Sequence, residues 1–353
     1  MAKSPRTDSD RGEHWVLVSD GADAGTRDCV VAIRALAQAG YNVAVTVRSP
    51  RAVLSRYVGR RVLVEDDIAD GIRREMDSGA YSAFIPASEE VVLSLDAQVP
   101  ALLDKVATSR RAREAGIAVP EEVVFDKPAD LAAAAHTLRY PVVIKPAVRT
   151  FQAFRADHAA DLIGAPIREG AVIVQPFLNG PMSAVAGVMW DSGVHSSTTE
   201  RWRRIWPLDC GLAAWAVTVP RSESLGTALA ALMNGYSGLF VAQFVDGHLI
   251  DLNLRVHSSL PLAVKAGVNL AAIYADLVRG VAPPPGHAEP GHTYRWISGD
   301  VKGLISSVRS GAMPVPEAMR ALSPVPGTVH SMVSWKDPLP MVARLATRLP
   351  GHK

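Results

Sequence analysis

Three polar residues at alternate positions make one stretch of the sequence well suited to chemistry. Asp251, Asn253 and Arg255 alternate with aliphatic residues over the segment 249–255. Because successive side chains of a β-strand point to opposite faces, the carboxylate, the amide and the guanidinium should share one face. Hard cations such as Mg²⁺ take oxygen ligands, and a guanidinium binds phosphate or carboxylate in a bidentate way. The pattern fits a site for a metal ion and its polyanion, and the alternative is a solvated strand face with a surface ion pair.

This strand should pair with the segment before it. The Asp-Gly pair at 246–247 is typical of a reverse turn, so residues 239–245 should form the other strand of a hairpin. A two-residue turn places Gln243 opposite Ile250 on the aliphatic face, whereas a three-residue loop or an equivalent bulge places it opposite Asp251. Burying an unpaired amide costs about 1–3 kcal/mol. This cost, together with a family resemblance of the hairpin, favours Gln243 opposite Asp251.

The residues of this hairpin resemble those of the ATP-grasp family. A Gln-Phe strand is followed by Asp251-x-Asn253-x-Arg255, a Ser-Ser loop and an Ala-Gly pair, as at the metal-binding end of that fold. The carbamoyl-phosphate-synthase-like branch also has Gln as the first metal ligand, whereas Asp251 replaces the usual Glu and Leu254 the usual Pro. The resemblance implies Mg²⁺ or Mn²⁺ as the metal, Arg255 as a catalytic group, and three metal ligands: Asp251, Asn253 and Gln243.

The resemblance covers roughly residues 14–282 and includes two lysines. Asp104-Lys105 opens a helix that should end at Gly116, similar to the run that begins the ATP-grasp domain. Lys145 stands at the end of the apolar strand YPVVIKPA, where an ammonium suits phosphate groups. The match implies that both lysines bind the phosphates of ATP. The alternatives are a charge on a basic helix face for Lys105 and a side chain that reaches solvent for Lys145.

A second apolar strand, AVIVQPFLNG, runs into a hinge at 175–178. In the resembling enzymes adenine lies against this hinge, which implies that the Pro176 carbonyl accepts from the exocyclic amine and the Leu178 amide donates to the ring. Proline has no N–H, but only its carbonyl is needed here. The resemblance therefore implies four ATP-binding residues: Gln175, Pro176, Phe177 and Leu178.

Two departures from the family pattern weaken the case for efficient phosphoryl transfer. Met182 stands where the family often has Glu, and the segment 148–166 contains a single glycine, Gly164, where a glycine-rich loop normally covers the phosphates. The side chains of Arg149 and Arg155 are candidates to bind phosphate in place of that loop.

A short cluster of arginines and tryptophans occupies residues 201–206. Such clusters can stack on single-stranded nucleic acid, but one cluster in a nearly neutral protein does not support that function. We expect Arg201 and Arg204 to contact a substrate carboxylate or the triphosphate, and the alternative is packing of the tryptophans against the core. His257 and Ser258 are further candidate contacts, although a lone histidine is more often structural.

The length, composition and charge of the chain lead us to expect a soluble protein. The chain has 353 residues, 48% of them hydrophobic, which is enough for two or three domains with their own cores. Its 37 basic and 35 acidic residues give no reason to expect nucleic acid or a membrane as the main partner. Cys29 and Cys210 lack metal spacing and fit a reducing compartment. We expect a cytoplasmic protein, with a homodimer as a candidate assembly.

Alternating strand and helix patterns predict an α/β fold. An apolar strand at 14–20, a helix at 28–40 and a strand at 42–47 form a β-α-β unit, which implies a parallel sheet. The loop between the first two lacks the G-x-G-x-x-G spacing, so a tight turn is favoured there. The domains expected from the pattern and the resemblance are a flexible tail (1–13), a Rossmann-like domain (14–103), a two-lobed ATP-grasp domain (104–282) and a C-terminal extension folded back on the main body (283–353).

The resemblance implies ATP-dependent ligation of a carboxylate to an amine or similar nucleophile. The carboxylate would attack the γ-phosphate, Arg255 would hold the acyl phosphate, and the nucleophile would displace phosphate. Two alternatives stay open. Gln243 favours carboxyl-phosphate chemistry on a small acid, although the chain is too short for a whole carbamoyl-phosphate synthase. The missing glycine loop and Met182 favour a nucleotide-binding protein without catalysis.

Overall fold

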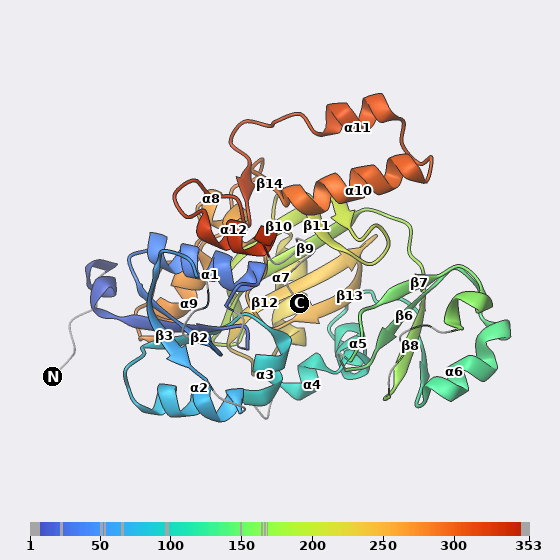
Figure 1. Cartoon of the computed structure of the whole chain (residues 1–353). Helices are drawn as coiled ribbons and strands as arrows, with labels where there is room; N and C mark the ends of the chain where they lie inside the picture. Colours follow the sequence, from blue (N-terminus) through green and yellow to red (C-terminus); the bar gives the residue numbers. More distant parts are fainter. Residues whose placement is uncertain are drawn as a thin grey trace.

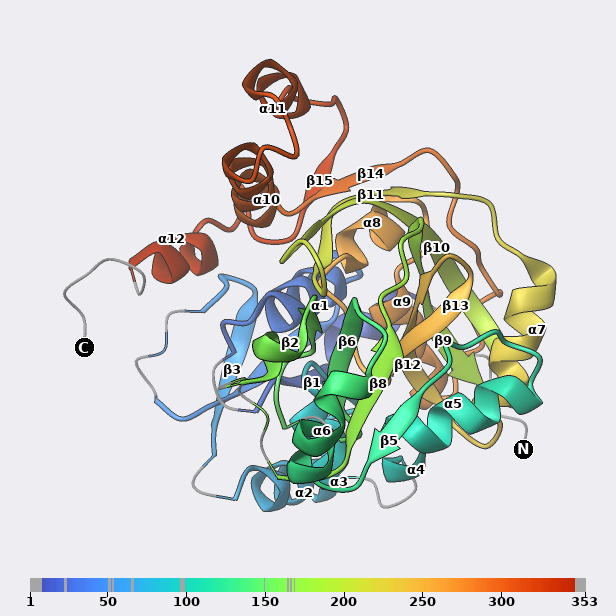
Figure 2. The same cartoon turned by 90° about the vertical axis from the view of Figure 1, so that its right-hand side faces the viewer.

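Three β-sheets and the helices around them form the α/β fold seen in Figures 1 and 2. The structure is a computed structural model, and it describes residues 8–21, 24–49, 52, 54–64, 67–95, 99–148, 150–163, 165, 167 and 169–346. In Figure 1 a parallel sheet lies on the left, a small antiparallel sheet on the right, and the largest sheet between them. No helix among these described residues is long and apolar enough to cross a membrane.

The first sheet is parallel, with the strand order β3-β2-β1-β4. Its central strand, β1, carries Val16, Leu17 and Val18, which have no exposed surface, as expected for a strand covered on both faces. The predicted β-α-β unit and parallel sheet are confirmed. The elements of this part are β1 (Trp15–Ser19), α1 (Arg27–Gln38), β2 (Asn42–Val47), β3 (Val58–Leu63), α2 (Ile68–Asp77) and β4 (Ala83–Pro86).

The second sheet is small and antiparallel, with the order β5-β8-β6-β7. Two short helices and α5 lead into it, whereas the sequence pattern predicts one helix over 88–103; residues 96–98 of that prediction lie outside the described residues. The elements are α3 (Glu89–Leu95), α4 (Pro100–Leu103), α5 (Lys105–Glu114), β5 (Val123–Phe125), α6 (Pro128–Ala134), η2 (Ala135–Thr137), β6 (Val142–Pro146), β7 (Phe154–Ala156), η3 (Ala159–Leu162) and β8 (Val172–Pro176).

The third sheet has seven strands in the order β13-β12-β9-β10-β11-β14-β15. On one face its apolar side chains share a core with α1, α8, α9 and the parallel sheet, so the first and third sheets pack as one body. Its strands are β9 (Met182–Trp190), β10 (Gly193–Trp206), β11 (Leu212–Thr218), β12 (Gly238–Val245), β13 (His248–Asn253), β14 (Thr293–Arg295) and β15 (Val329–His330), and its helices are α7 (Glu223–Leu232), α8 (Leu260–Lys265) and α9 (Leu270–Val278).

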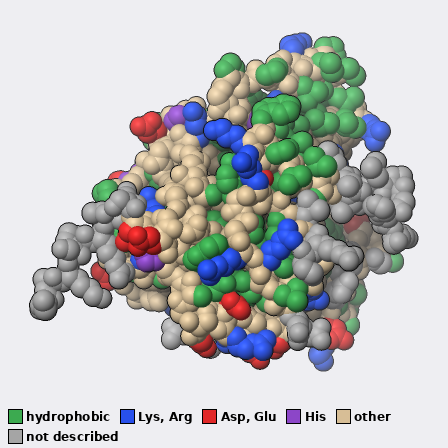
Figure 3. All heavy atoms as spheres, turned by 60° about the vertical axis from the view of Figure 1, so that its left-hand side comes forward, with side chains coloured by type: hydrophobic (Ala, Val, Ile, Leu, Met, Phe, Trp, Pro, Cys, Tyr) green, Lys and Arg blue, Asp and Glu red, His purple; other side chains and the backbone are tan. Residues whose placement is uncertain are grey.

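The C-terminal segment joins the third sheet through β14 and β15, so it folds back on the main body as predicted. The sequence pattern TYRWISGD predicts a strand over 293–300, but β14 ends at Arg295 and α10 (Ile297–Arg309) begins two residues later. The last described helices are α11 (Val315–Ala321) and α12 (Leu339–Ala346). Several apolar side chains of this segment are exposed, among them Met319 at 64% and Trp335 at 96%. Figure 3 shows hydrophobic side chains gathered on the upper part of the molecule, where these helices lie.

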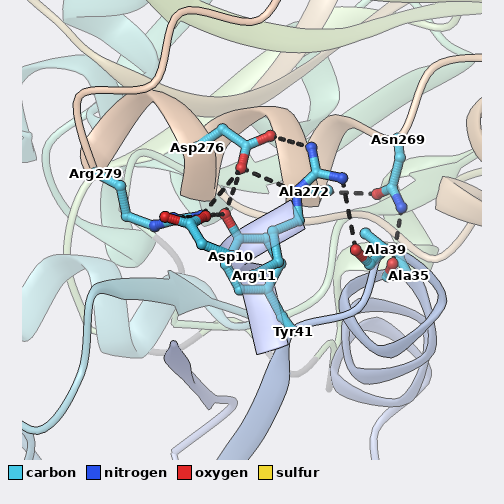
Figure 4. A network of polar contacts seen from close by, with 9 residues as sticks. All are labelled: Asp10, Arg11, Ala35, Ala39, Tyr41, Asn269, Ala272, Asp276 and Arg279. Atoms are coloured by element: carbon cyan, nitrogen blue, oxygen red, sulfur yellow. Dashed lines mark hydrogen bonds and ion pairs between the residues drawn. The ribbon is translucent and has the colours of Figure 1, made fainter. Parts of the chain in front are cut away.

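The N-terminal residues 8–13 form a 3-10 helix, η1 (Asp8–Glu13), instead of part of a flexible tail. A polar network centred on the fully buried Asp276 of α9 holds this helix (Figure 4). Asp276 binds Arg11 and the Tyr41 hydroxyl, and Arg279 binds Tyr41 at 2.8 Å and Asp10. The prediction of a flexible tail is therefore wrong for residues 8–13, because a buried carboxylate requires donors that η1 supplies.

Candidate functional site

A cleft of about 350 Å³ opens between the small antiparallel sheet and the seven-stranded sheet. β6, β8 and the hinge after β8 form one wall, and β12 and β13 form the other. The six residues that the resemblance assigns to ATP and the three that it assigns to the metal all lie along this cleft, together with Arg255. The cleft-lining residues from that prediction are Lys105, Lys145, Gln175, Pro176, Phe177, Leu178, Gln243, Asp251, Asn253 and Arg255.

The register of the β12–β13 hairpin places Gln243 beside Asp251. The turn at 246–247 has two residues with φ of 48° and 78°, and it pairs Val245 with His248. A bulge at Ile250 then shifts the register, so that Gln243 lies opposite Asp251. The predicted pairing is confirmed, and a bulge produces it rather than a longer turn.

Asp251 is a carboxylate among cations. Lys105 makes an ion pair with Asp251 Oδ1, and the Asn253 side-chain amide donates to Oδ2 at 2.7 Å. Burial raises the pKa of Asp251, but the charges of Lys105 and Lys145 and these hydrogen bonds outweigh burial and lower it to about 2. The carboxylate is therefore ionised at neutral pH and already paired with a positive charge.

Lys145 reaches into the cleft from the end of β6 and is only 6% exposed. Its Nζ donates to the carbonyl of Ile250 at 3.1 Å, so the bulge residue supplies its acceptor. Burial lowers the pKa of Lys145, and repulsion from Lys105 adds to this effect, to a value of about 8. An anion that enters the cleft would stabilise this ammonium.

The first residue of α5 is Lys105, and local contacts hold it in place. The carboxylate of Asp104 accepts hydrogen bonds from the amides of Val106 and Ala107 at 2.9 and 3.0 Å, which is a standard N-cap arrangement. The Lys105 amide donates to the carbonyl of Ala147 at 3.0 Å, which ties the start of α5 to the end of β6. The two lysines thus enter the cleft from adjacent elements.

The hinge after β8 has its own anchors. The Phe177 amide donates to the carbonyl of Pro141 at 3.0 Å, and the Gln175 side chain donates to Glu122 at 3.1 Å. These bonds engage neither the Pro176 carbonyl nor the Leu178 amide, the two groups expected to contact adenine. Arg155 stacks on the Phe177 ring at 4.2 Å.

Arg255 connects the cleft with the parallel sheet. It lies two residues beyond the end of β13, and its Nη1 pairs with Asp28 of α1 and donates to the carbonyl of Val256 at 2.9 Å. Its Nε is buried without a hydrogen-bond partner in the described part of the chain.

Four predicted substrate contacts lie elsewhere. Arg201 is exposed on β10, and Ser258 is partly exposed after β13. Arg204 pairs with the fully buried Asp300 of α10 and therefore holds the C-terminal segment. His257 is buried 3.6 Å from Glu200. The cleft lining that brings the other predicted residues together includes none of these four described residues.

Of the two arginines considered for phosphate, Arg155 pairs with Asp157 and Asp209 and lies outside the cleft lining. Arg149 and the single glycine of that segment, Gly164, lie outside the described residues.

Several cleft residues are absent from the prediction. Glu89 at the start of α3 lines the cleft, as do Phe151, Gln152 and Ala153 of the β6–β7 loop, where side chains occupy the place of the family's glycine-rich loop. The position of this loop after Lys145 could have indicated its proximity. The sequence contains no comparable signal for Glu89, because Glu90 beside it is identical in type and exposed.

The comparisons with known proteins rest on structure alone, since no protein-family model and no curated protein matches the sequence. An L-amino acid ligase from Bacillus licheniformis is 16% identical, with a TM-score of 0.57 over 75% of this chain and 74% of that one. N5-carboxyaminoimidazole synthetase from Staphylococcus aureus is 12% identical, with a TM-score of 0.60 over 85% and 86% of the two chains.

A third similar structure contains ligands. It is the biotin carboxylase domain dimer of 2-oxoglutarate carboxylase from Hydrogenobacter thermophilus, in complex with MgADP, ADP and bicarbonate. It is 13% identical, with a TM-score of 0.58 over 79% of this chain and 73% of that one. These similar structures are ATP-grasp ligases, and the chain has the ATP-grasp fold.

Proposed function

We propose that the protein is an ATP-dependent ligase that joins a carboxylate to an amine or similar nucleophile through an acyl phosphate. The observation that carries this proposal is the gathering, along one cleft, of a hinge, two lysines, an ionised carboxylate with two amides, and Arg255. The similar ligases share the fold, and the S. aureus enzyme has also been solved with ADP. Within this proposal, residues 14–103 are the Rossmann-like domain and 104–282 the two-lobed ATP-grasp domain.

Each cleft residue has a role consistent with its chemistry. Adenine would lie at the hinge, with Lys105 and Lys145 on the phosphates. Asp251, Asn253 and Gln243 offer the oxygen atoms that Mg²⁺ or Mn²⁺ prefers, and the pairing of Asp251 with an ammonium indicates that its position already favours a cation. The ion, when bound, would neutralise charge on the terminal phosphates. Arg255 would orient the reacting carboxylate and hold the acyl phosphate.

A second candidate is carboxyl-phosphate chemistry on bicarbonate or another small acid. It is supported by Gln243, the ligand type expected for the carbamoyl-phosphate-synthase-like branch, and by the bicarbonate in one of the similar structures. Both candidates release ADP. They differ in whether an organic carboxylate is required, and a homodimer remains a prediction for either.

The test is the release of ADP and phosphate from MgATP when panels of carboxylates and amines are offered in pairs. The proposal expects turnover that depends on both partners and on the metal. Bicarbonate alone as the effective acid would support the second candidate. Hydrolysis that no added acid or amine changes would contradict both.

The metal assignment can be tested separately from turnover. Electron paramagnetic resonance of Mn²⁺ with ADP should detect a bound ion, and Asp251→Asn should weaken that binding about 100-fold. Asp246→Asn on the exposed turn of the same hairpin is the matched control and should leave Mn²⁺ binding unchanged. Equal Mn²⁺ affinity for Asp251→Asn and the parent would remove Asp251 from the metal site.

A further inference from the structure

Both oxygens of the Asp251 carboxylate are engaged within the chain itself. Oδ1 forms the ion pair with the Lys105 ammonium, and Oδ2 accepts from the Asn253 side-chain amide at 2.7 Å. The ion pair is shielded from solvent, since 15% of the Lys105 side chain and 27% of the Asp251 side chain are exposed. A metal ion would need these carboxylate oxygens, so an ion that binds to Asp251 has to compete with the Lys105 ammonium.

The second lysine of the cleft is held differently. Lys145 donates to the backbone carbonyl of Ile250 at 3.1 Å, so it occupies neither oxygen of Asp251, although its charge also acts on that carboxylate. Without a nucleotide, a metal ion at Asp251 would therefore meet the repulsion of both ammonium groups. Like charges repel strongly at such short range, and partial burial increases the repulsion.

The backbone of Lys105 is fixed, so only its side chain can leave Asp251. The Asp104 cap and the bond from the Lys105 amide to the Ala147 carbonyl hold the start of α5. The Lys105 side chain lines two spaces, the cleft of about 350 Å³ and a second cavity of about 10 Å³, which has room for about one water. A flexible four-carbon stem that turns away from Asp251 therefore finds room in the cleft, where nucleotide phosphates would offer the ammonium a new anionic partner.

We propose that Lys105 acts as a built-in counter-ion, which keeps a metal ion from Asp251 until a nucleotide draws the ammonium onto its phosphates. The inference rests on the metal site of the proposed function and specifies how that site is regulated. Metal alone binds weakly, and metal and nucleotide bind with positive coupling. Removing the Lys105 charge should therefore strengthen the binding of metal alone. A lysine that only binds phosphate or only stabilises the fold would leave that affinity unchanged or lower it.

The experiment measures Mn²⁺ binding by electron paramagnetic resonance, with and without ADP. We expect the parent to bind Mn²⁺ about 100-fold more tightly with ADP than without it. Lys105→Met should bind Mn²⁺ alone about tenfold more tightly than the parent, because no ammonium competes for Asp251. The effect of ADP should then fall to about tenfold or less. The Mn²⁺–ADP complex in solution is the same in every titration, so ratios between variants report the protein.

Four further variants assign the effect to the ion pair. Lys105→Arg keeps the charge and should bind Mn²⁺ alone no more tightly than the parent. Lys145→Met removes an equal charge from the same cleft but frees no carboxylate oxygen, so it should strengthen binding less than Lys105→Met does. Lys127→Met, at an exposed position before α6, should change nothing. Adding Asp251→Asn to Lys105→Met should abolish the gain, which places the ion at Asp251.

The outcomes separate the inference from the function on which it rests. A folded Lys105→Met that binds Mn²⁺ alone no more tightly than the parent would overturn the inference, and Mn²⁺ binding with ADP that Asp251→Asn weakens would leave the proposed metal site standing. Thermal unfolding identifies a variant that fails to fold, and Lys105→Gln then replaces Lys105→Met. A parent that binds Mn²⁺ equally tightly with and without ADP would overturn the inference without any variant. A parent that binds no Mn²⁺ even with ADP would overturn both.

Discussion

The surroundings of two side chains in the cleft, Lys145 and Asp251, determine their pKa values. Lys145 has a pKa of about 8 because burial and the neighbouring Lys105 disfavour its charge, and its Nζ is held by the Ile250 carbonyl. Asp251 has a pKa of about 2 because the two ammonium groups outweigh its burial. At neutral pH the Lys145 ammonium and the Asp251 carboxylate are therefore mainly charged. The cleft thus offers a cation to a bound phosphate and a carboxylate to a metal ion.

This pKa predicts how the affinity for nucleotide depends on pH. A bound phosphate raises the pKa of Lys145, so below about pH 8 the group is protonated with or without nucleotide, and it adds no pH dependence. Above about pH 8 binding must take up a proton, and the association constant should fall by up to about tenfold per pH unit. Calorimetry with MgADP across this range measures the slope.

Lys145→Arg is the control for this prediction, because a guanidinium stays protonated over the whole range. The variant should bind MgADP with an affinity that no longer falls above about pH 8. A parent protein with constant affinity to about pH 10 would contradict the low pKa of Lys145.

At the residue scale, the sequence predicts the features that depend on the local side-chain period. Asp251 and Asn253 are predictable because a strand places every second residue on one face, and Lys145 because it ends an apolar strand. Glu89 is not predictable, since only the packing of α3 decides which of two adjacent acids turns inward. Arg204 looks like a substrate contact in sequence, but the buried Asp300, 96 positions later, binds it.

At the scale of elements, the β12–β13 hairpin and the hinge loop position the site together. The Asp246 amide donates to the carbonyl of Pro181 at 3.0 Å, which joins the turn of the hairpin to the segment after the hinge. A Cβ at Gly180 would lie 2.6 Å from the Cβ of Asp246, closer than any normal contact. The hinge can therefore approach the hairpin only with glycine at position 180.

Gly180→Ala should lower the free energy of unfolding by about 1–3 kcal/mol and weaken MgADP binding, because the hinge or the turn must move. Urea unfolding and calorimetry measure the two effects. Asp246→Gly in the same chain removes the opposing Cβ and should restore most of the loss. Gly193→Ala, whose nearest atom would lie at 3.8 Å, is the control. A loss that Asp246→Gly does not relieve would refute the contact.

The β12–β13 hairpin has one feature that the sequence predicts and one that it does not. The face of Gln243 is predictable from the cost of burying its amide, but the bulge is one of two devices that give the same register. Whether a bulge or a longer turn forms depends on the two-residue turn and on the hydrogen bond from Lys145 to the Ile250 carbonyl. This hydrogen bond is a tertiary contact. The sequence also does not predict the position of the β6–β7 loop, because the absence of glycines does not reveal that Phe151 and Gln152 line the cleft.

At the scale of the whole molecule, a polar network joins the first described residues of the chain to α9. Asp276 accepts from Arg11 and Tyr41, and desolvation and the bond to Asp276 raise the pKa of Tyr41 to about 12. Asn269 donates to the carbonyl of Ala35 at 2.7 Å, so α1 is held by the same helix (Figure 4). The network thus ties η1, α1 and the third sheet's helices together.

Asp276→Asn should lower the free energy of unfolding by about 3–5 kcal/mol, because it removes the charge of the buried carboxylate that accepts from Arg11 and Tyr41. Asp70→Asn removes half of an exposed ion pair with Arg73 and should cost at most about 1 kcal/mol. Guanidinium unfolding of both variants makes the comparison. Equal losses would mean that the network contributes no more than a surface pair.

Long-range contacts of this kind are the part of the fold that the sequence does not predict. Arg11 and Asp276 are 265 positions apart, and each alone resembles an ordinary surface charge. The parallel sheet and the returning C-terminal segment are predictable because strand and helix periods are local. The pairing of β14 with β11 and the start of α10 at Ile297 depend on contacts with the seven-stranded sheet. A local sequence pattern does not reveal such contacts.

Equilibrium binding of MgATP to the parent protein, Lys145→Ala and Lys105→Ala tests most directly whether the two lysines face the phosphates of a nucleotide held in this cleft. Lys145 stands beside the hinge strand with a backbone carbonyl as its acceptor, whereas Asp251 already pairs with Lys105. We therefore predict that Lys145→Ala weakens MgATP binding at least about tenfold, or about 1.4 kcal/mol, and more than Lys105→Ala does. A folded Lys145→Ala that binds MgATP as tightly as the parent would contradict the account.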